Sequence, residues 1–182
     1  MARVTLIGEE QHPQLAALVE RIRGARRGRL LNIYRLLLHS PPLAEAWLDF
    51  NSAVRFATDL DGQTRELAVM RVAILNRVDY IVQAHASFHA PHEGLTPALI
   101  GALADWQGCP LFTAAQRALL GYVDAMTRDI DVADDVFEPL RAHYSERQIV
   151  ELTVLVGAYN MHTRVLKALD IDPESAAQDR PA

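Results

Sequence analysis

The sequence has a single cysteine, Cys109, among its 182 residues. One thiol cannot form an intrachain disulfide or a cysteine-rich zinc site, so disulfide-stabilised folds and zinc ribbons are excluded. The sequence also has no apolar run close to the ~20 residues that a membrane span needs. Its first residues, 1–5, lack the apolar segment and cleavage site of a secretory signal. We therefore expect a protein of the reducing cytoplasm that has no membrane partner.

Lysine is almost absent as well, because Lys167 is the only one and arginine carries nearly all of the positive charge. The formal net charge of −5 at pH 7 argues against a nucleic-acid partner. One local exception is a basic cluster; its members are Arg21, Arg23, Arg26, Arg27 and Arg29. Two glycines interrupt the cluster, as is usual at a helix end, where cations complement the helix dipole. The alternative is an anion-binding site.

Strand signals are missing, because no run of β-branched or aromatic residues alternates with polar ones between turn signals. Apolar residues at three- and four-residue spacing instead predict helices over most of the chain. The expected helices cover residues 13–24, 30–39, 42–54, 64–75, 79–93, 97–103, 113–126, 132–143 and 145–169. Thr113 and Ser145 each open a capping box, Asp79 is a candidate N-cap, and Pro139 is expected to interrupt its helix. The predicted fold class is all-α.

A length of 182 residues indicates a single domain. We expect an N-terminal helix with its basic connector over residues 1–29, a helical domain over 30–170 and a polar tail over 171–182. Two helical stretches, 67–75 and 152–169, have few charges around their circumference. Such helices need cover on more than one side, so we expect a homo-oligomer.

The most specific pattern pairs Glu66 with His85, nineteen residues later on the next predicted helix. The stretches 31–35, 39–43, 65–67, 80–85, 93–95 and 144–166 complete a set with this pair. As a set they resemble the carboxymuconolactone decarboxylase and alkylhydroperoxidase family over residues from about 30 to 170. The resemblance implies an alkylhydroperoxidase-type helical bundle that assembles as an oligomer. It places the site at the ends of the helices that carry Glu66 and His85.

Half of the family's active-site pattern is absent. That pattern reads Glu, a Cys-x-x-Cys that begins twelve residues later, and a His four residues after it; this chain has Val78 and Ile81 at the cysteine positions. Without a nucleophilic and a resolving thiol, the redox cycle of the peroxidase branch cannot run. The resemblance implies that the decarboxylase branch needs no cysteine, metal or organic cofactor. We therefore expect no cofactor, and a small-molecule substrate that is a carboxylated lactone or a related acid.

The resemblance assigns the chemistry to Glu66 and His85. When a carboxylated muconolactone loses carbon dioxide, the remaining electron pair delocalises toward the lactone carbonyl and is then protonated. Histidine is the side chain suited to donate a proton near neutral pH, and a nearby glutamate can orient the ring and stabilise its charge. Two alternatives stay open. The pair is a core ion pair in a non-catalytic helical binding or scaffold protein, or the chain is a redox protein that uses Cys109 across a subunit boundary.

Four further side chains are candidates for substrate binding: Tyr80, His89, Tyr34 and His39. Tyr80 lies between the two former cysteine positions, where its hydroxyl either hydrogen-bonds a substrate carboxylate or accompanies a packed aromatic ring. Tyr34 and His39 come from a helix far away in the sequence. They line a pocket or belong to the core.

Two other patterns are predicted to be structural. His85, His89 and His92 would share one face of an uninterrupted helix and could then hold a metal. Pro91 is expected to end the helix before His92, so we expect no metal site. Arg164 lies in an apolar helix, where a buried charge needs a partner, and an ion pair is favoured over substrate binding.

Overall fold

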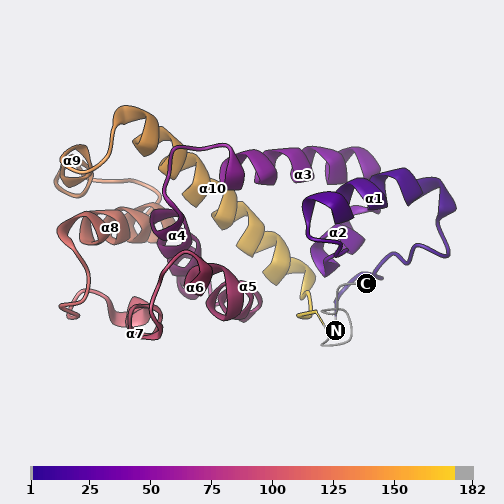
Figure 1. The fold of residues 1–182 in the computed structure, drawn as a ribbon, viewed down its shortest axis with the longest axis horizontal. Coiled ribbons are helices and arrows are strands. Elements are labelled where there is room, and N and C mark those ends of the chain that lie inside the picture. Colours follow the sequence, from indigo (N-terminus) through magenta and orange to yellow (C-terminus); the bar gives the residue numbers. More distant parts are fainter. Residues whose placement is uncertain (1, 175–182) are drawn as a thin grey trace. The chain divides into compact units, whose positions relative to one another are not determined.

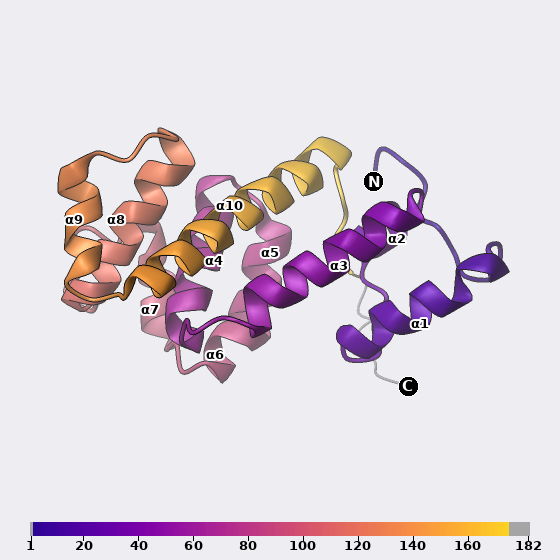
Figure 2. The ribbon, with the colours of Figure 1, turned by 90° about the horizontal axis from the view of Figure 1, so that it is seen from above.

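The computed structural model describes residues 2–174, and all regular structure within them is helical (Figures 1 and 2). No strand occurs in these residues, so the all-α prediction is confirmed. They divide into two compact units: residues 2–56 with 165–174, and Ala57–Arg164. None of the helices in the described range is long and apolar enough to cross a membrane. The boundaries predicted at residues 29 and 170 stay a prediction, and the predicted tail lies outside the described residues from position 175 onward.

The first unit contains η1 (Pro13–Leu15), α1 (Ala16–Ala25), α2 (Asn32–Leu37) and α3 (Pro41–Phe56). α3 packs against both α1 and α2. α1 ends at the predicted place, because Arg27 and Gly28 adopt left-handed φ angles of 56° and 78°. Arg21 and Arg23 of the basic cluster form ion pairs with carboxylates, Arg21 with Asp49 at 2.5 Å. These pairs support the interpretation of the cluster as a solvated helix end.

The second unit begins with α4 (Gly62–Leu75), which lies between α8 and the α5–α6 pair (Figures 1 and 2). Its remaining elements follow in chain order as α5 (Asp79–Ala84), η2 (His85–His89), α6 (Ala90–His92), α7 (Pro97–Ala102), η3 (Leu103–Asp105), α8 (Ala114–Arg128), α9 (Asp134–Arg141) and α10 (Glu146–Leu169). α10 begins in this unit, and its last residues belong to the first.

The central helix α4 starts two residues earlier than predicted. Asp61 is its N-cap, and the carboxylate accepts the backbone N–H of Thr64 at 2.9 Å. The helix stops at Asn76, which is its C-cap. Its apolar residues between Leu67 and Ala73 are buried in the single chain. The expectation that this helix needs a second subunit to cover it was therefore wrong, because α5, α6 and α8 already surround it.

Other helix starts follow the predicted signals. Thr113 and Gln116 form a complete capping box at α8, with hydrogen bonds of 3.2 and 3.0 Å. Ser145 and Gln148 make the same reciprocal pair at the start of α10. Thr96 caps α7 through its hydroxyl.

Three local predictions were wrong. Asp79 is the first residue of α5, and Val78 occupies the N-cap position. Pro91 does not end the helix before His92, because α6 begins at Ala90, directly after the π turn, and continues through Pro91 to His92. Pro139 lies inside α9 without interrupting it. The side of α9 that carries Pro139 is exposed, so water can satisfy the carbonyl that proline leaves without a donor.

Candidate functional site

Glu66 and His85 are in direct contact, as the family resemblance implied. The Nδ1 atom of His85 lies 2.5 Å from Oε2 of Glu66. Glu66 belongs to the first half of α4 and His85 opens η2, so the contact joins two packed elements. The side chains are only 7% and 1% exposed for His85 and Glu66. A hydrogen bond from Nδ1–H to the carboxylate fixes the orientation of the His85 ring. The other ring nitrogen, Nε2, points away from Glu66.

His85 begins a π-helical turn, which the sequence analysis did not predict. The N–H of Ala90 donates to the carbonyl of His85, five residues earlier, where an α-helix would use the fourth. Such turns are rare and occur mostly within α-helices, frequently at functional sites. Here the turn separates α5 from α6 and carries His85 and His89 at its two ends. Apolar spacing over five residues does not distinguish a π turn from an α turn, so no sequence signal was available.

Aromatic and imidazole rings surround His85. The His89 ring lies 4.8 Å from that of His85, and Tyr159 of α10 meets His85 edge-on at 6.0 Å, measured between centroids. Phe88 contacts His89 edge-on and is 50% exposed. The rings thus lead from an exposed phenyl group to the buried Tyr159. His89, a predicted substrate ligand, is adjacent to the Glu66–His85 pair.

The other predicted substrate ligands have different positions. Tyr80 is in α5, one turn before His85, and is partly exposed. Tyr34 and His39 belong to the first unit. The hydroxyl of Tyr34 accepts the Nε–H of Arg26 at 3.0 Å, and a ring nitrogen of His39 lies 2.8 Å from the carbonyl oxygen of Thr5. Substrate binding by these residues stays a prediction.

The histidines do not form a metal site in the structure. His92 stacks its ring on Phe88 at 6.0 Å, even though the helix continues through Pro91. Within residues 2–174 no group of three or more His, Cys, Asp or Glu side chains is placed to hold a metal ion.

Arg65 and Glu93 flank the pair, and the sequence analysis did not assign them to the site. Nη2 of Arg65 donates to Oε1 of Glu93 at 2.9 Å. Nε of the same guanidinium lies 3.8 Å from Oε1 of Glu66. The signal for Arg65 was its position next to Glu66, and the signal for Glu93 was its place in the stretch 93–95.

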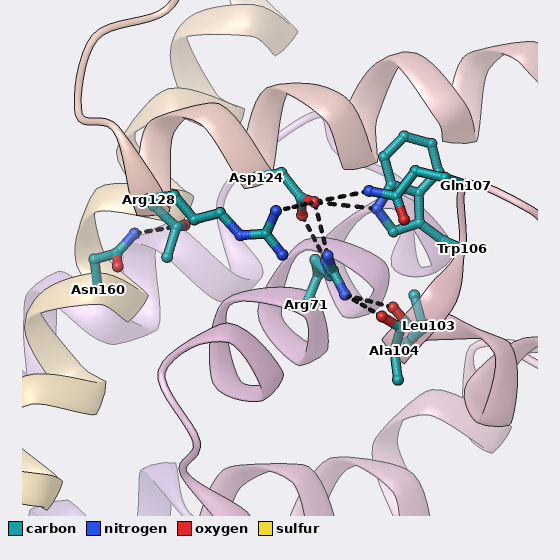
Figure 3. A network of polar contacts seen from close by, with 9 residues as sticks. Arg71, Leu103, Ala104, Trp106, Gln107, Asp124, Arg128 and Asn160 are labelled. Carbon is teal, nitrogen blue, oxygen red and sulfur yellow. Dashed lines mark hydrogen bonds and ion pairs between the residues drawn. The ribbon is translucent and has the colours of Figure 1, made fainter.

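A second buried cluster surrounds Arg71, one and a half turns after Glu66 on α4. Arg71 is 1% exposed, and its Nε and Nη2 donate to the two carboxylate oxygens of Asp124 at 2.5 and 2.7 Å (Figure 3). Nη1 donates to the carbonyls of Leu103 and Ala104. Trp106 adds a donor to Asp124 at 3.3 Å. These bonds fasten α4, η3 and α8 together, so we regard the cluster as structural.

The buried arginine is therefore Arg71, and the prediction for Arg164 was wrong. Arg164 is exposed and donates to the carbonyl and the side-chain oxygen of Asn160 on the same helix. A charge in the middle of the apolar stretch 67–75 was the available signal for Arg71, because an arginine there must be paired. Tyr144 is also structural: burial raises the pKa of its hydroxyl, which donates to the carbonyl of Ala115 at 3.3 Å.

Comparison with known proteins shows which of them resemble this chain. Residues 41–125 match the model of the carboxymuconolactone decarboxylase family. The uncharacterised Escherichia coli protein YnjA is 31% identical over 126 residues, which are 69% of this chain and 66% of YnjA. The crystal structure of ATU0492 from Agrobacterium tumefaciens, a protein of unknown function regarded as an AhpD-type antioxidant defence protein, is 31% identical with a TM-score of 0.72. The similarity covers 77% of this chain and 96% of that one. The chain belongs to the carboxymuconolactone decarboxylase and alkylhydroperoxidase-like family.

The family fold extends over the whole chain. A peroxidase-related protein from Silicibacter has a TM-score of 0.82 and 19% identity, over 100% of this chain and 96% of the other. At this identity the likeness shows the fold alone, and it is the fold of a single all-α domain.

Within this family the chain lacks the thiols of the redox members. Val78 and Ile81, at the positions of the two cysteines, are buried at 4% and 3% exposure. Cys109 is outside α5, in the segment between η3 and α8, and its backbone carbonyl accepts a hydrogen bond from Arg117. The carboxylate and the imidazole of the family pattern are present without the dithiol that they accompany elsewhere.

Proposed function

We propose that this family member is a cofactor-independent carboxy-lyase of the cytoplasm, acting on a small carboxylated lactone or a related acid. The observation that supports the proposal is the buried contact between Glu66 and His85. A carboxylate 2.5 Å from Nδ1 stabilises an imidazolium that can then donate from Nε2. Tyr80 and His89 are the proposed substrate ligands in the same unit.

The reaction needs a proton donor and no electron acceptor. The bond between the ring carbon and the carboxylate carbon breaks, and carbon dioxide leaves. The electron pair of that bond delocalises toward the lactone carbonyl. His85 then donates a proton from Nε2 to carbon, and the ring regains a proton from water. Glu66 stays ionised throughout and holds the ring in its orientation.

The buried side chains of Val78 and Ile81 favour this proposal over peroxide reduction. A thiol pair is the nucleophile and the resolving group of the redox branch, and apolar side chains cannot replace either. The remaining alternative is a helical binding protein in which Glu66 and His85 form only an ion pair. Catalysis distinguishes the two.

The test is a screen of γ-carboxylated lactones with purified protein, in which carbon dioxide release is measured. We expect turnover in wild type, and Glu66→Gln and His85→Gln should each lose about a hundredfold or more in rate, the usual scale of general acid–base catalysis. Cys109→Ser is the matched control and should lose less than about tenfold, or ~1.4 kcal/mol of barrier.

Three outcomes contradict the proposal. They are no carbon dioxide from any carboxylated lactone, a folded His85→Gln protein with wild-type turnover, and a Cys109→Ser protein that loses all activity. Circular dichroism of each variant must match wild type, since loss of one partner of a buried pair can unfold a protein and imitate a catalytic defect.

A further inference from the structure

Four ionisable groups form a cluster at the N-terminal end of α4. Glu66 contacts His85 on one side, and Arg65 lies between Glu66 and Glu93. The side chains of Glu66, His85 and Arg65 are 1%, 7% and 12% exposed, and that of Glu93 is 33% exposed. Three of the four charges are thus largely shielded from water, where charges interact more strongly than at the surface.

The contacts of Arg65 are unequal. It donates to Glu93 at 2.9 Å, whereas its Nε is 3.8 Å from Glu66 and makes no hydrogen bond within the described residues. Nε of Arg65 is at ion-pair distance from Glu66, so the carboxylates of Glu66 and Glu93 share one guanidinium, and the contact with Glu93 is the shorter. Glu93 comes from the end of α6 and meets the guanidinium directly. The guanidinium thus lies closer to Glu93 than to Glu66.

Gly62 makes room for the Glu93 carboxylate. A Cβ at position 62 would lie 1.7 Å from Oε2 of Glu93 and 2.3 Å from Cδ. Both distances are far below van der Waals contact, so any side chain at position 62 would displace the carboxylate. The absence of a side chain on the first residue of α4 thus permits the contact between Glu93 and Arg65.

The charges of the cluster do not balance without His85. Glu66 and Glu93 contribute two negative charges and Arg65 contributes one positive charge, so a protonated His85 makes the cluster neutral. Two other titratable groups contact His85, His89 from η2 and Tyr159 from α10; behind them, His162 lies against Tyr159 and His92 stacks on Phe88. None of these is a carboxylate or a guanidinium. The cluster supplies the carboxylate that contacts His85 directly.

We propose that Arg65 and Glu93 are positioning residues, and that Glu93 holds Arg65 away from Glu66 so that the carboxylate of Glu66 stabilises the imidazolium of His85. The inference rests on the proposed role of His85 as proton donor. It assigns opposite roles to the two residues. The negative charge of Glu93 favours the imidazolium, and the positive charge of Arg65 opposes it.

The test is a titration of the His85 ring by proton–nitrogen NMR in protein without substrate, with His85 assigned by comparison with His85→Gln. Glu93→Gln should lower the pKa of His85 by roughly one unit, because Arg65 then pairs with Glu66. Gly62→Ala should also lower the pKa of His85, because the added Cβ displaces the Glu93 carboxylate although no charged side chain is removed. Arg65→Gln should raise it by a similar amount.

Gly101→Ala is the matched control, since Gly101 lies in α7 and a Cβ there meets nothing within 4 Å. It should leave the pKa of His85 unchanged. A merely structural role for Arg65 and Glu93 would not shift the pKa in opposite directions. Equal pKa values in all variants, shifts of the same sign for Arg65→Gln and Glu93→Gln, or a ring that does not titrate between about pH 5 and 9 would overturn the inference.

Failure of this inference is distinguishable from failure of the proposed function. If the expected pKa shifts occur and no carboxylated lactone releases carbon dioxide, the proposed function is wrong, whereas the positioning role of Arg65 and Glu93 is supported. If carbon dioxide is released and Glu93→Gln leaves the pKa of His85 unchanged, the proposed lyase activity is supported and Glu93 is not a positioning residue.

Discussion

At the scale of single residues, Arg71 and Glu66 show two ways of burying a charge on one helix. Arg71 has donors satisfied by a carboxylate and by two backbone carbonyls, and this arrangement leaves little freedom for a ligand. Glu66 contacts the Nδ1 atom of His85 at 2.5 Å, and Nε of Arg65 lies 3.8 Å from its other carboxylate oxygen. The first arrangement fits a structural group and the second fits a reactive one, although both side chains are almost fully buried.

The Arg71–Asp124 pair gives a stability prediction. Arg71→Met leaves the Asp124 carboxylate without its two main donors, so we expect the free energy of unfolding to fall by about 3–5 kcal/mol. Urea denaturation followed by circular dichroism measures the loss. Arg128→Met is the matched control, because Arg128 approaches the same carboxylate at 3.6 Å from a side chain that is 54% exposed (Figure 3). It should cost less than about 1 kcal/mol, and equal losses in the two variants would contradict a special role for the buried pair.

At the scale of elements, side-chain caps stabilise the starts of α4 and α8. Asp61 caps α4 and Thr113 caps α8, and these two helices pack against each other. α5, the π turn η2 and α6 begin without a side-chain cap, and η2 is bounded by helix on both sides.

The capping box of α8 can be tested by itself. Thr113→Ala removes the oxygen that accepts the N–H of Gln116, so the protein should lose ~1 kcal/mol of stability. Thr113→Ser keeps the hydroxyl and should lose much less. Thermal and urea unfolding of both variants give the comparison. If alanine and serine destabilise the protein equally, the hydroxyl does not stabilise the helix.

At the scale of the whole molecule, the prediction of a homo-oligomer now depends on α10 alone. Val150, Val154 and Met161 are 62%, 42% and 40% exposed at spacings of four and seven residues, so they form an apolar stripe on one face of this helix. Soluble monomers seldom expose such a stripe. The stretch 67–75 of α4 no longer supports an oligomer, because its apolar residues are buried within one chain.

Light scattering at micromolar concentration should therefore report a species larger than the 20.3 kDa chain. The double change Val154→Glu with Met161→Glu places charges in the stripe and should shift the protein toward monomer. Ile130→Glu is the control, because Ile130 is 84% exposed in the connection between α8 and α9, away from the stripe. A wild-type monomer, or a double variant that assembles as wild type does, would contradict the prediction.

The sequence by itself determined the helical class, most helix starts and the partnership of Glu66 with His85. Local rules govern the first two features: the caps at Thr113 and Ser145 act within one turn, and apolar periodicity marks each buried face. The resemblance to the family also depended on residues, and family membership confirmed it. The missing thiols were equally evident from Val78 and Ile81 alone.

The tertiary structure alone decided which charges are buried and with which partners they pair. Arg71 meets Asp124 across 53 positions of sequence and Arg65 meets Glu93 across 28. Periodicity could not distinguish Arg71 from Arg164, because each lies in an apolar helix and only the packing of neighbouring helices covers one and exposes the other. The close approach of Glu93 to Gly62 was likewise not readable from the sequence, because it joins the end of α6 to the start of α4.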